Sequence, residues 1–214
     1  MTGATKGLFV VLEGGDGVGK STQVRRLTAW LEERGLPHLV TRQPGGTRIG
    51  VKLREILLDP DHQELQARTE ALVYAADKAQ HVDEVIRPAL ARGEVVLSDR
   101  YVDSMIAYQG AGRVLDPVEI ERVADWATGG LVPDLTVLLD VDPGQAVVRI
   151  RQQDRLEAAG LDFHRRVREH FLHLARRAPE RYLILPARAP RERIAASVAE
   201  AVAARLAARD GRTP

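Results

Sequence analysis

The sequence predicts an α/β fold in which a parallel sheet is covered by helices on both faces. Short apolar runs alternate along the chain with longer amphipathic segments, and this alternation is typical of parallel strands joined by right-handed crossovers. Two of the runs, 95–97 and 135–139, are almost continuously apolar, as in strands that are buried on both faces. A glycine-rich loop separates the first run from the first helical segment. Together these features indicate a five-stranded parallel sheet.

Each element has its own local signal in the sequence. The expected strands occupy 8–13, 38–41, 94–98, 134–140 and 182–185. The expected helices occupy 21–34, 49–58, 69–92, 117–128, 143–155, 163–177 and 191–209. Gly35 and Gly93 directly follow two of these helices, where glycine commonly forms a left-handed cap. Asp116 and Pro117 open another helix as N-cap and first helical residue. Because no linker or repeat interrupts the pattern, we expect a single domain over residues 1–214.

Composition limits the class of protein. The hydrophobic content of 44% and the charged content of 29% are typical of a globular chain. No apolar run approaches the ~20 residues that span a bilayer, and no basic segment followed by an apolar run opens the sequence, so we expect neither a membrane partner nor a secretory signal. The chain has no cysteine, which fits a cytoplasmic location. A net charge of +1 gives no reason to expect a nucleic-acid partner.

The glycine-rich loop carries the strongest functional signal. Residues 14–22 read Gly-Gly-Asp-Gly-Val-Gly-Lys-Ser-Thr, the pattern of a phosphate-binding loop. In such a loop the backbone N–H groups and the helix N-terminus surround a phosphate, Lys20 adds a positive charge, and the Ser21 hydroxyl can ligate Mg²⁺. The sequence therefore predicts the P-loop NTPase fold and a bound nucleoside triphosphate. The residues expected to contact it are Gly14, Gly15, Asp16, Gly17, Val18, Gly19, Lys20, Ser21 and Thr22.

Charged residues follow the next two strands of the predicted sheet. Ligands of open parallel sheets gather at the carboxyl ends of the strands. Asp99 ends the third strand and can position Mg²⁺ in a phosphate-loop enzyme. Arg42 and Arg100 stand at two strand ends and could clamp a substrate phosphate. The alternative for Asp99 and Arg100 is a structural ion pair.

A basic segment lies near the C-terminal third of the chain. Residues 149–193 contain 12 arginines against 6 acidic residues. Arg151 and Arg155 share one helical face, and Arg149 precedes them. One interpretation is a solvent-exposed helical face. The other is a helical lid at about 149–161 that closes over the triphosphate and places arginines against the transferred group.

Several segments together resemble the bacterial thymidylate kinases, which transfer the γ-phosphoryl group of ATP to dTMP. The resemblance rests on residues 14–22, on Thr-Arg-Gln-Pro-Gly-Gly-Thr at 41–47, on Ser-Asp-Arg-Tyr-Val-Asp-Ser at 98–104, and on Ala-Tyr-Gln-Gly at 107–110. It continues through 133–136, 154–157 and 162–163 and fades after about residue 178. It implies ATP and dTMP as substrates, Mg²⁺ as cofactor, and a homodimer formed through helices such as 69–92.

The resemblance also implies roles for individual residues. Asp16 would contact the sugar 3′-hydroxyl of dTMP, while Arg42, Arg54 and Arg100 would hold its phosphate. Tyr74 would stack on thymine, Tyr108 would pack against the 2′ position, and Gln109 would lie near the base. The implied substrate-binding set is Asp16, Arg42, Pro44, Arg54, Tyr74, Lys78, Arg100, Ser104, Met105, Tyr108 and Gln109. The implied catalytic residues are Lys20, Asp16, Arg100, Arg149, Arg151 and Arg155, and the implied metal ligands are Ser21, Asp99 and Asp16. Because the phosphate loop has no arginine, the chain resembles the branch that carries its catalytic arginine on the lid.

The sequence departs from the family pattern at four positions near the acceptor. Tyr74 replaces Phe, a mild change because a phenol stacks as well as a benzene ring. Gln43 replaces the usual Glu, Lys78 replaces an Arg that reads thymine and the phosphate, and Met105 replaces Ser or Asn near the base. Lys78 keeps the charge but loses the bidentate geometry of an arginine. A kinase for another acceptor, such as dUMP, therefore remains an alternative. A nucleotide-dependent switch protein is a further alternative, which the absence of a guanine-reading motif disfavours.

Overall fold

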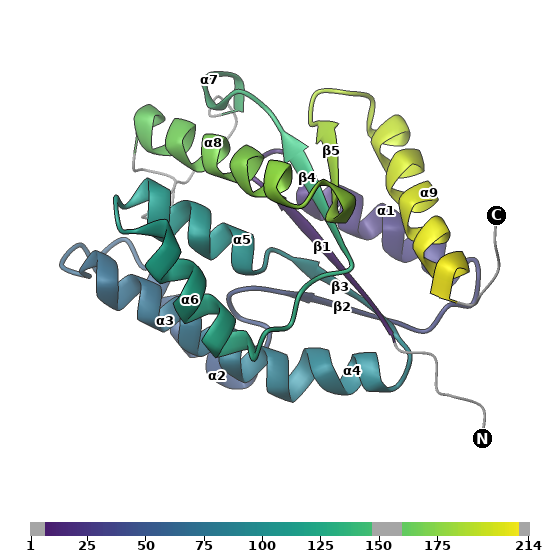
Figure 1. The fold of residues 1–214 in the computed structure, drawn as a ribbon, viewed down its shortest axis with the longest axis horizontal. Helices are drawn as coiled ribbons and strands as arrows, with labels where there is room; N and C mark the ends of the chain where they lie inside the picture. The colour runs from purple at the N-terminus through teal and green to yellow at the C-terminus, as the bar shows by residue number, and fades with distance from the viewer. Residues whose placement is uncertain (1–6, 147–159, 210–214) are drawn as a thin grey trace.

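The structure, a computed structural model, describes residues 7–146 and 160–209 and contains a five-stranded sheet (Figure 1). The strands lie in the order β2-β3-β1-β4-β5, and every neighbouring pair is parallel. Their bounds are β1 (Leu8–Gly14), β2 (His38–Arg42), β3 (Val95–Asp99), β4 (Leu135–Asp140) and β5 (Tyr182–Pro186). The predicted strands are confirmed to within one residue at either end.

Helices cover both faces of this sheet (Figure 1). They are α1 (Lys20–Glu32), α2 (Arg48–Leu58), α3 (Ala67–His81), α4 (Arg87–Ala91), α5 (Val102–Met105), α6 (Pro117–Thr128), α7 (Pro143–Ala146), α8 (Leu161–Arg177) and α9 (Arg191–Arg209). The described residues also contain two π-helical turns, η1 (Val82–Ile86) and η2 (Ile106–Gly112), and a 3₁₀ turn, η5 (Pro179–Arg181). The predicted α/β architecture is therefore confirmed.

The alternation of side chains along β1 divides the core into two layers. Val10 and Leu12 face α1 and α9, where they pack with residues such as Leu27 of α1. Phe9 and Val11 face the opposite layer, which contains η1 and α4. All of these side chains are buried. The apolar run that predicted a strand covered on both faces is thus explained by helices on each side.

The register of the sheet brings three loops to one edge. Leu12 of β1 pairs with Asp99 of β3, and Arg42 of β2 pairs with the same Asp99. The loop that follows Gly14 therefore begins beside the ends of β2 and β3. This shared edge is where ligands of parallel sheets bind.

Two helical segments differ from the prediction. The helix expected at 69–92 is divided into α3, η1 and α4, and Pro88 stands in the first turn of α4. Proline has no N–H to donate, so a wider turn precedes it. The helix formed by α5 and η2 was not predicted, because Gly110 and Gly112 disfavour a helix interior. A side chain at Gly112 would lie 2.6 Å from the Phe163 ring, which explains the glycine.

Part of the predicted lid cannot be compared with the structure. Within the expected helix 143–155, α7 covers Pro143–Ala146, and residues 147–159 lie outside the described part of the chain. Arg149, Arg151 and Arg155, and all of the lid range 149–161 except its last two residues, fall there.

Candidate active site

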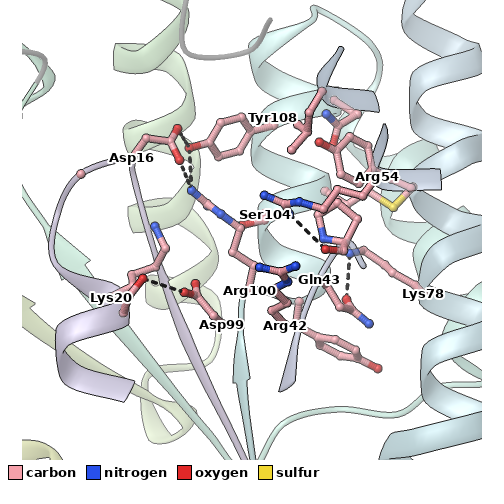
Figure 2. A pocket seen from close by; sticks show the side chains of 18 residues that line it. Asp16, Lys20, Arg42, Gln43, Arg54, Lys78, Asp99, Arg100, Ser104 and Tyr108 are labelled. Atoms are coloured by element: carbon pink, nitrogen blue, oxygen red, sulfur yellow. Dashed lines mark hydrogen bonds and ion pairs between the residues drawn. The ribbon is translucent and has the colours of Figure 1, made fainter. Parts of the chain in front are cut away.

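A cavity of about 310 Å³ lies at the carboxyl edge of the sheet (Figure 2). All of the acceptor-site residues predicted from the sequence line it: Asp16, Arg42, Pro44, Arg54, Tyr74, Lys78, Arg100, Ser104, Met105, Tyr108 and Gln109. Gly17, Lys20, Ser21, Gln43, Leu58, Asp99 and Tyr101 complete the lining. The structure thus brings the phosphate loop and the residues of several distant segments into one cavity.

The phosphate loop is held in its turn by glycine conformations that other residues avoid. Gly14 and Gly19 have φ angles of 132° and 102°, and a side chain at Gly14 would lie 2.5 Å from the carbonyl oxygen of Leu139. Lys20 opens α1, and its ammonium donates to the carbonyl oxygens of Gly14 at 3.1 Å and Gly15 at 2.6 Å. Burial, with repulsion from Arg100, lowers the pKa of Lys20 to about 8. The Lys20 ammonium therefore lies inside the loop in which it is expected to bind phosphate.

Ser21 and Asp99 form the oxygen pair beside this loop. The Ser21 hydroxyl donates to a carboxylate oxygen of Asp99 at 3.4 Å, and both residues line the cavity. A hydroxyl and a carboxylate are hard oxygen donors of the kind that Mg²⁺ prefers. The described residues contain no group of three or more His, Asp or Glu side chains that could hold a metal by themselves. A bound ion would accordingly need oxygens from the nucleotide and from water.

Arg100 is the centre of a buried polar cluster. Its backbone has a φ of 71°, a left-handed conformation that is uncommon outside glycine. Its guanidinium donates to the Gly14 carbonyl at 3.0 Å and to the Ser104 hydroxyl at 2.9 Å, and it forms an ion pair with Asp16. Tyr108 donates its hydroxyl to the second oxygen of Asp16 at 2.8 Å. A strained backbone at a site rim is typical of a functional residue.

The contacts in this cluster determine the ionisation and the hydrogen bonding of Asp16. Burial opposes the ionisation of Asp16, but Arg100 and Lys20 outweigh it and lower the pKa of the carboxyl group. Its two oxygens accept hydrogen bonds from Arg100 and Tyr108, and within the described residues neither forms a hydrogen bond with Ser21. The arrangement supports Asp16 as part of the acceptor wall better than as a direct metal ligand.

Glu13 is a site residue that the sequence reasoning missed. It is completely buried at the end of β1, and one of its oxygens accepts from the backbone N–H groups of Tyr101 at 2.8 Å and Ser104 at 3.2 Å. Its other oxygen accepts from the Ser104 hydroxyl at 2.6 Å. It thereby fixes the segment that follows Arg100. A carboxylate inside an otherwise apolar strand was the available signal, because a buried charge needs such partners.

The guanidinium groups of Arg42 and Arg54 point into the same cavity as that of Arg100 (Figure 2). Arg54 donates to the carbonyl oxygen of Pro44 at 3.0 Å. Arg42 is exposed and forms no ion pair within the described residues. Three arginines around one cavity make a binding site for a dianionic group such as a phosphate monoester.

Part of the cavity wall is formed by an aromatic ring and a thioether. These belong to Tyr74 and Met105, which are both buried. The Lys78 ammonium lies 6.0 Å from the centre of the Tyr74 ring. Gln109 donates its amide to Glu70 at 2.9 Å, which orients the carboxamide. An aromatic ring beside an oriented amide suits a planar base with polar edges.

The sequence is similar to that of one family of known proteins. The family model described as thymidylate kinase matches residues 12–198. The chain belongs to the thymidylate kinase family. It is 62% identical to a thymidylate kinase of Cutibacterium acnes over 169 residues, which cover 79% of this chain and 83% of that protein. It is 55% identical to a thymidylate kinase of Clavibacter michiganensis over 206 residues, covering 94% and 97% of the two chains.

A solved structure agrees with this assignment. The crystal structure of the thymidylate kinase from Ehrlichia chaffeensis superposes with a TM-score of 0.76 at 28% identity, and the match covers 92% of this chain and 99% of that one. The resemblance inferred from the sequence is therefore confirmed for the family and the fold.

Three of the residues that the sequence predicts to depart from the family pattern belong to the cavity wall. Gln43, Lys78 and Met105 all line the cavity and are all nearly completely buried. Lys78 donates to the Gln43 carboxamide at 3.0 Å, so the two substitutions are in direct contact. Met105 lies apart from both, in the apolar cluster that contains Tyr74.

A second, smaller cavity lies on the other side of the phosphate loop. Its volume is about 120 Å³, and it is lined by Gly17, Val18, Gly19, Thr22, Gln23, Val141, Ala187, Arg188, Arg191 and Ile194. It joins the loop to the segment between β5 and α9. The loop therefore separates two cavities.

Proposed function

We propose that the chain is a Mg²⁺-dependent kinase that transfers the γ-phosphoryl group of ATP to dTMP and forms dTDP for dTTP synthesis. One observation carries the proposal: the phosphate-loop residues Asp16, Gly17 and Lys20 line the same cavity as the arginines expected to hold the acceptor. Two phosphorylated molecules can therefore meet end to end at the loop. The membership of the thymidylate kinase family supports this choice of substrates.

The donor would lie across residues 14–22. The backbone N–H groups of the loop and Lys20 would hold the β- and γ-phosphates. The smaller cavity between the loop and the β5–α9 segment would take the nucleoside of ATP, since it opens from Gly17 and Thr22. Arg188 and Arg191 line that cavity and supply polar and cationic edges for it.

The acceptor would fill the larger cavity. Arg42, Arg54 and Arg100 surround the expected position of the dTMP phosphate, and Tyr74 and Gln109 lie at the end where the base would bind. Tyr108 and Asp16 are joined by a hydrogen bond in the cavity wall, where the sugar would lie. Pro44, Lys78, Ser104 and Met105 would form the remaining wall.

Ser21 and Asp99 would hold Mg²⁺ together with phosphate oxygens. A bound Mg²⁺ neutralises developing charge on the transferred group and on the leaving phosphates. The proximity of a hydroxyl and a carboxylate at 3.4 Å supports this pair as ligands. The contacts of Asp16 with Arg100 and Tyr108 leave it to orient the acceptor.

The reaction would need no general base. The phosphate of dTMP is already an anion at neutral pH, so the site has to position it in line and to shield charge. Arg100 and Lys20, which line the larger cavity, would stabilise the negative charge on the transferred phosphoryl group. The proposed lid at 149–161 would close over the triphosphate and bring Arg149, Arg151 and Arg155 to the transferred phosphoryl group. These three arginines lie outside the described residues, so their role rests on the sequence alone.

We also propose a homodimer that works in the cytoplasm as one domain over residues 1–214. Ile49 and Ile56 of α2 and Leu72 of α3 expose large apolar side chains, and α2 packs against α3. An apolar patch shared by two neighbouring helices fits a subunit contact. Within the described residues, the helices are too short or too polar to cross a bilayer.

The direct test is an assay with ATP, Mg²⁺ and dTMP. We expect formation of ADP and dTDP that depends on dTMP, and kcat/KM for dTMP above that for dUMP. Turnover of ATP without stimulation by dTMP would instead favour a switch protein. No feature of the site favours that reading, since the acceptor cavity would have no use in a hydrolase.

A further inference from the structure

A chain of hydrogen bonds lies behind the wall of the acceptor cavity. The Lys78 ammonium donates to the Gln43 carboxamide oxygen at 3.0 Å, and the Gln43 amide nitrogen lies 2.8 Å from Nδ1 of His81. Nε2 of His81 lies 2.6 Å from the Thr41 hydroxyl. Gln43, Lys78 and His81 expose 2%, 2% and 0% of their surface, so these three side chains are almost completely shielded from solvent. Only Gln43 and Lys78 reach the cavity itself.

The chemistry of the partners fixes the direction of every bond. An ammonium can only donate, so the carboxamide oxygen of Gln43 must face Lys78 and its NH₂ group must face His81. The Nδ1 atom of His81 then accepts and carries no proton. The proton of the neutral ring is consequently on Nε2, from which it is donated to the Thr41 hydroxyl. Burial and the charge of Lys78 lower the pKa of His81 to about 4, in agreement with a neutral ring.

The His81 ring is also fixed sterically. A side chain at Gly46 would lie 2.3 Å from Nε2 of His81, so the loop after β2 packs directly on the ring. The neighbouring Gly45 donates its N–H to Asp77 of α3 at 2.9 Å, which fastens the same loop to the same helix. The far end of the hydrogen-bond chain is therefore rigid, and its position is transmitted to Gln43.

The partner of Lys78 is neutral. No carboxylate of the described residues forms an ion pair with the Lys78 ammonium. A carboxamide satisfies one N–H of the ammonium without cancelling its charge. The remaining charge is available to an anionic or carbonyl oxygen in the cavity that Lys78 lines.

We propose that Gln43 is a positioning residue of the acceptor site, which holds the Lys78 ammonium at the cavity wall through the oriented chain that ends at His81 and Thr41. Gln43 acts through Lys78 and not by its own contact with the nucleotide. This inference rests on the proposed acceptor site, and it adds that two departures from the family pattern operate as one unit.

A double-mutant cycle in the full-length enzyme tests this dependence. Gln43→Met keeps the length of the side chain and removes both hydrogen bonds, and Lys78→Met removes the charge. We expect Gln43→Met to raise KM for dTMP about tenfold, in line with the loss of a hydrogen bond to a charged group. We expect kcat and KM for ATP to stay within about twofold. In the Lys78→Met background, Gln43→Met should change KM for dTMP by less than about twofold.

If Gln43 and Lys78 act independently, the double-mutant cycle gives the opposite result. If the two effects multiply in the double variant, or if Gln43→Met lowers kcat and leaves KM for dTMP unchanged, the proposal is overturned. Gln63→Met serves as the matched control, because Gln63 is exposed and lies outside both cavities. It should leave both KM values unchanged. A wild-type enzyme without dTMP-dependent turnover would instead refute the proposed function.

A second measurement needs no variant. The ¹⁵N chemical shifts of the His81 ring in the wild-type protein report which nitrogen carries the proton. We expect a neutral ring protonated on Nε2 throughout pH 6–8. A ring protonated on Nδ1, or a ring charged at pH 7, would contradict the direction of the hydrogen bonds. This reading decides the orientation of Gln43 even if Gln43→Met fails to fold or the assay shows no kinase activity.

Discussion

The two sides of the candidate site are built in opposite ways. The proposed phosphate site of the donor is a single run of residues, 14–22, whose backbone is set by glycine conformations and whose N–H groups are expected to bind the phosphates. The acceptor side is assembled from β2, α2, α3, β3, α5 and η2, and its ligands are side chains. The donor side thus depends on local backbone geometry, and the acceptor side depends on packing between distant elements.

This difference has a consequence for robustness. Backbone ligands survive most changes of side chain, provided that the glycines remain. Side-chain ligands depend on the partners that hold them, as Arg100 depends on Asp16 and Ser104, and Ser104 on Glu13. The comparison leads us to expect that few side chains matter strongly in the phosphate loop, whereas the acceptor side is a network in which many residues each contribute.

The largest effect is expected at the donor side. Lys20→Ala removes the ammonium from the loop and should lower kcat roughly 100- to 1000-fold, as the loss of a preorganised charge does. Thermal unfolding should be almost unchanged, because the hydrogen bonds of Lys20 within the described residues go to loop carbonyls. The measurement is steady-state kinetics with a melting curve of each protein. A nearly active Lys20→Ala enzyme would show that the loop does not hold the transferred phosphates.

A smaller but still large effect is expected from Arg100. Arg100→Lys keeps the charge but cannot reach Gly14, Ser104 and Asp16 together, so kcat/KM for dTMP should fall about 100-fold through lost positioning. KM for ATP should change little. Equal losses for both substrates would argue that the two sides of the site are not separate.

The metal prediction probes the boundary between the two sides. Asp99→Asn should raise the Mg²⁺ concentration needed for half-maximal activity about 10- to 100-fold, since it removes one hard oxygen charge. Removing the metal with a chelator should abolish turnover in the wild type. Asp61→Asn, a change at an exposed residue outside the cavity, is the control. An unchanged Mg²⁺ requirement in Asp99→Asn would exclude this carboxylate as a ligand.

The smallest effect is a pH dependence that should separate the two sides. The pKa values of Lys20 and Lys78 are both lowered to about 8 by burial, so each loses its charge as the pH rises through that value. ATP and dTMP affinity should therefore both fall above pH 8, by at most about tenfold per pH unit. Lys20→Arg should remove only the change for ATP, and Lys78→Arg only the change for dTMP. Calorimetric titrations between pH 7 and 9.5 would measure this, and identical profiles in all three proteins would contradict it.

Part of this protein follows from the sequence alone. The five strands and the phosphate loop were predicted because each is encoded in consecutive residues, whose apolar runs and glycines act locally. The acceptor residues were located through a family pattern spread over most of the chain, and all of them line the cavity. Their individual roles stay predictions, as does the lid.

Only the tertiary structure decided how those residues are held. Glu13 looked like one more strand residue, yet it binds the segment after Arg100 because the sheet register places both at the same edge. His81 carried no signal in the sequence, because its partners Thr41 and Gln43 lie in β2 and directly after it, about 40 residues away. A buried hydrogen bond between distant segments depends on where helices pack, and that position is set by the whole core and not by any local run of residues.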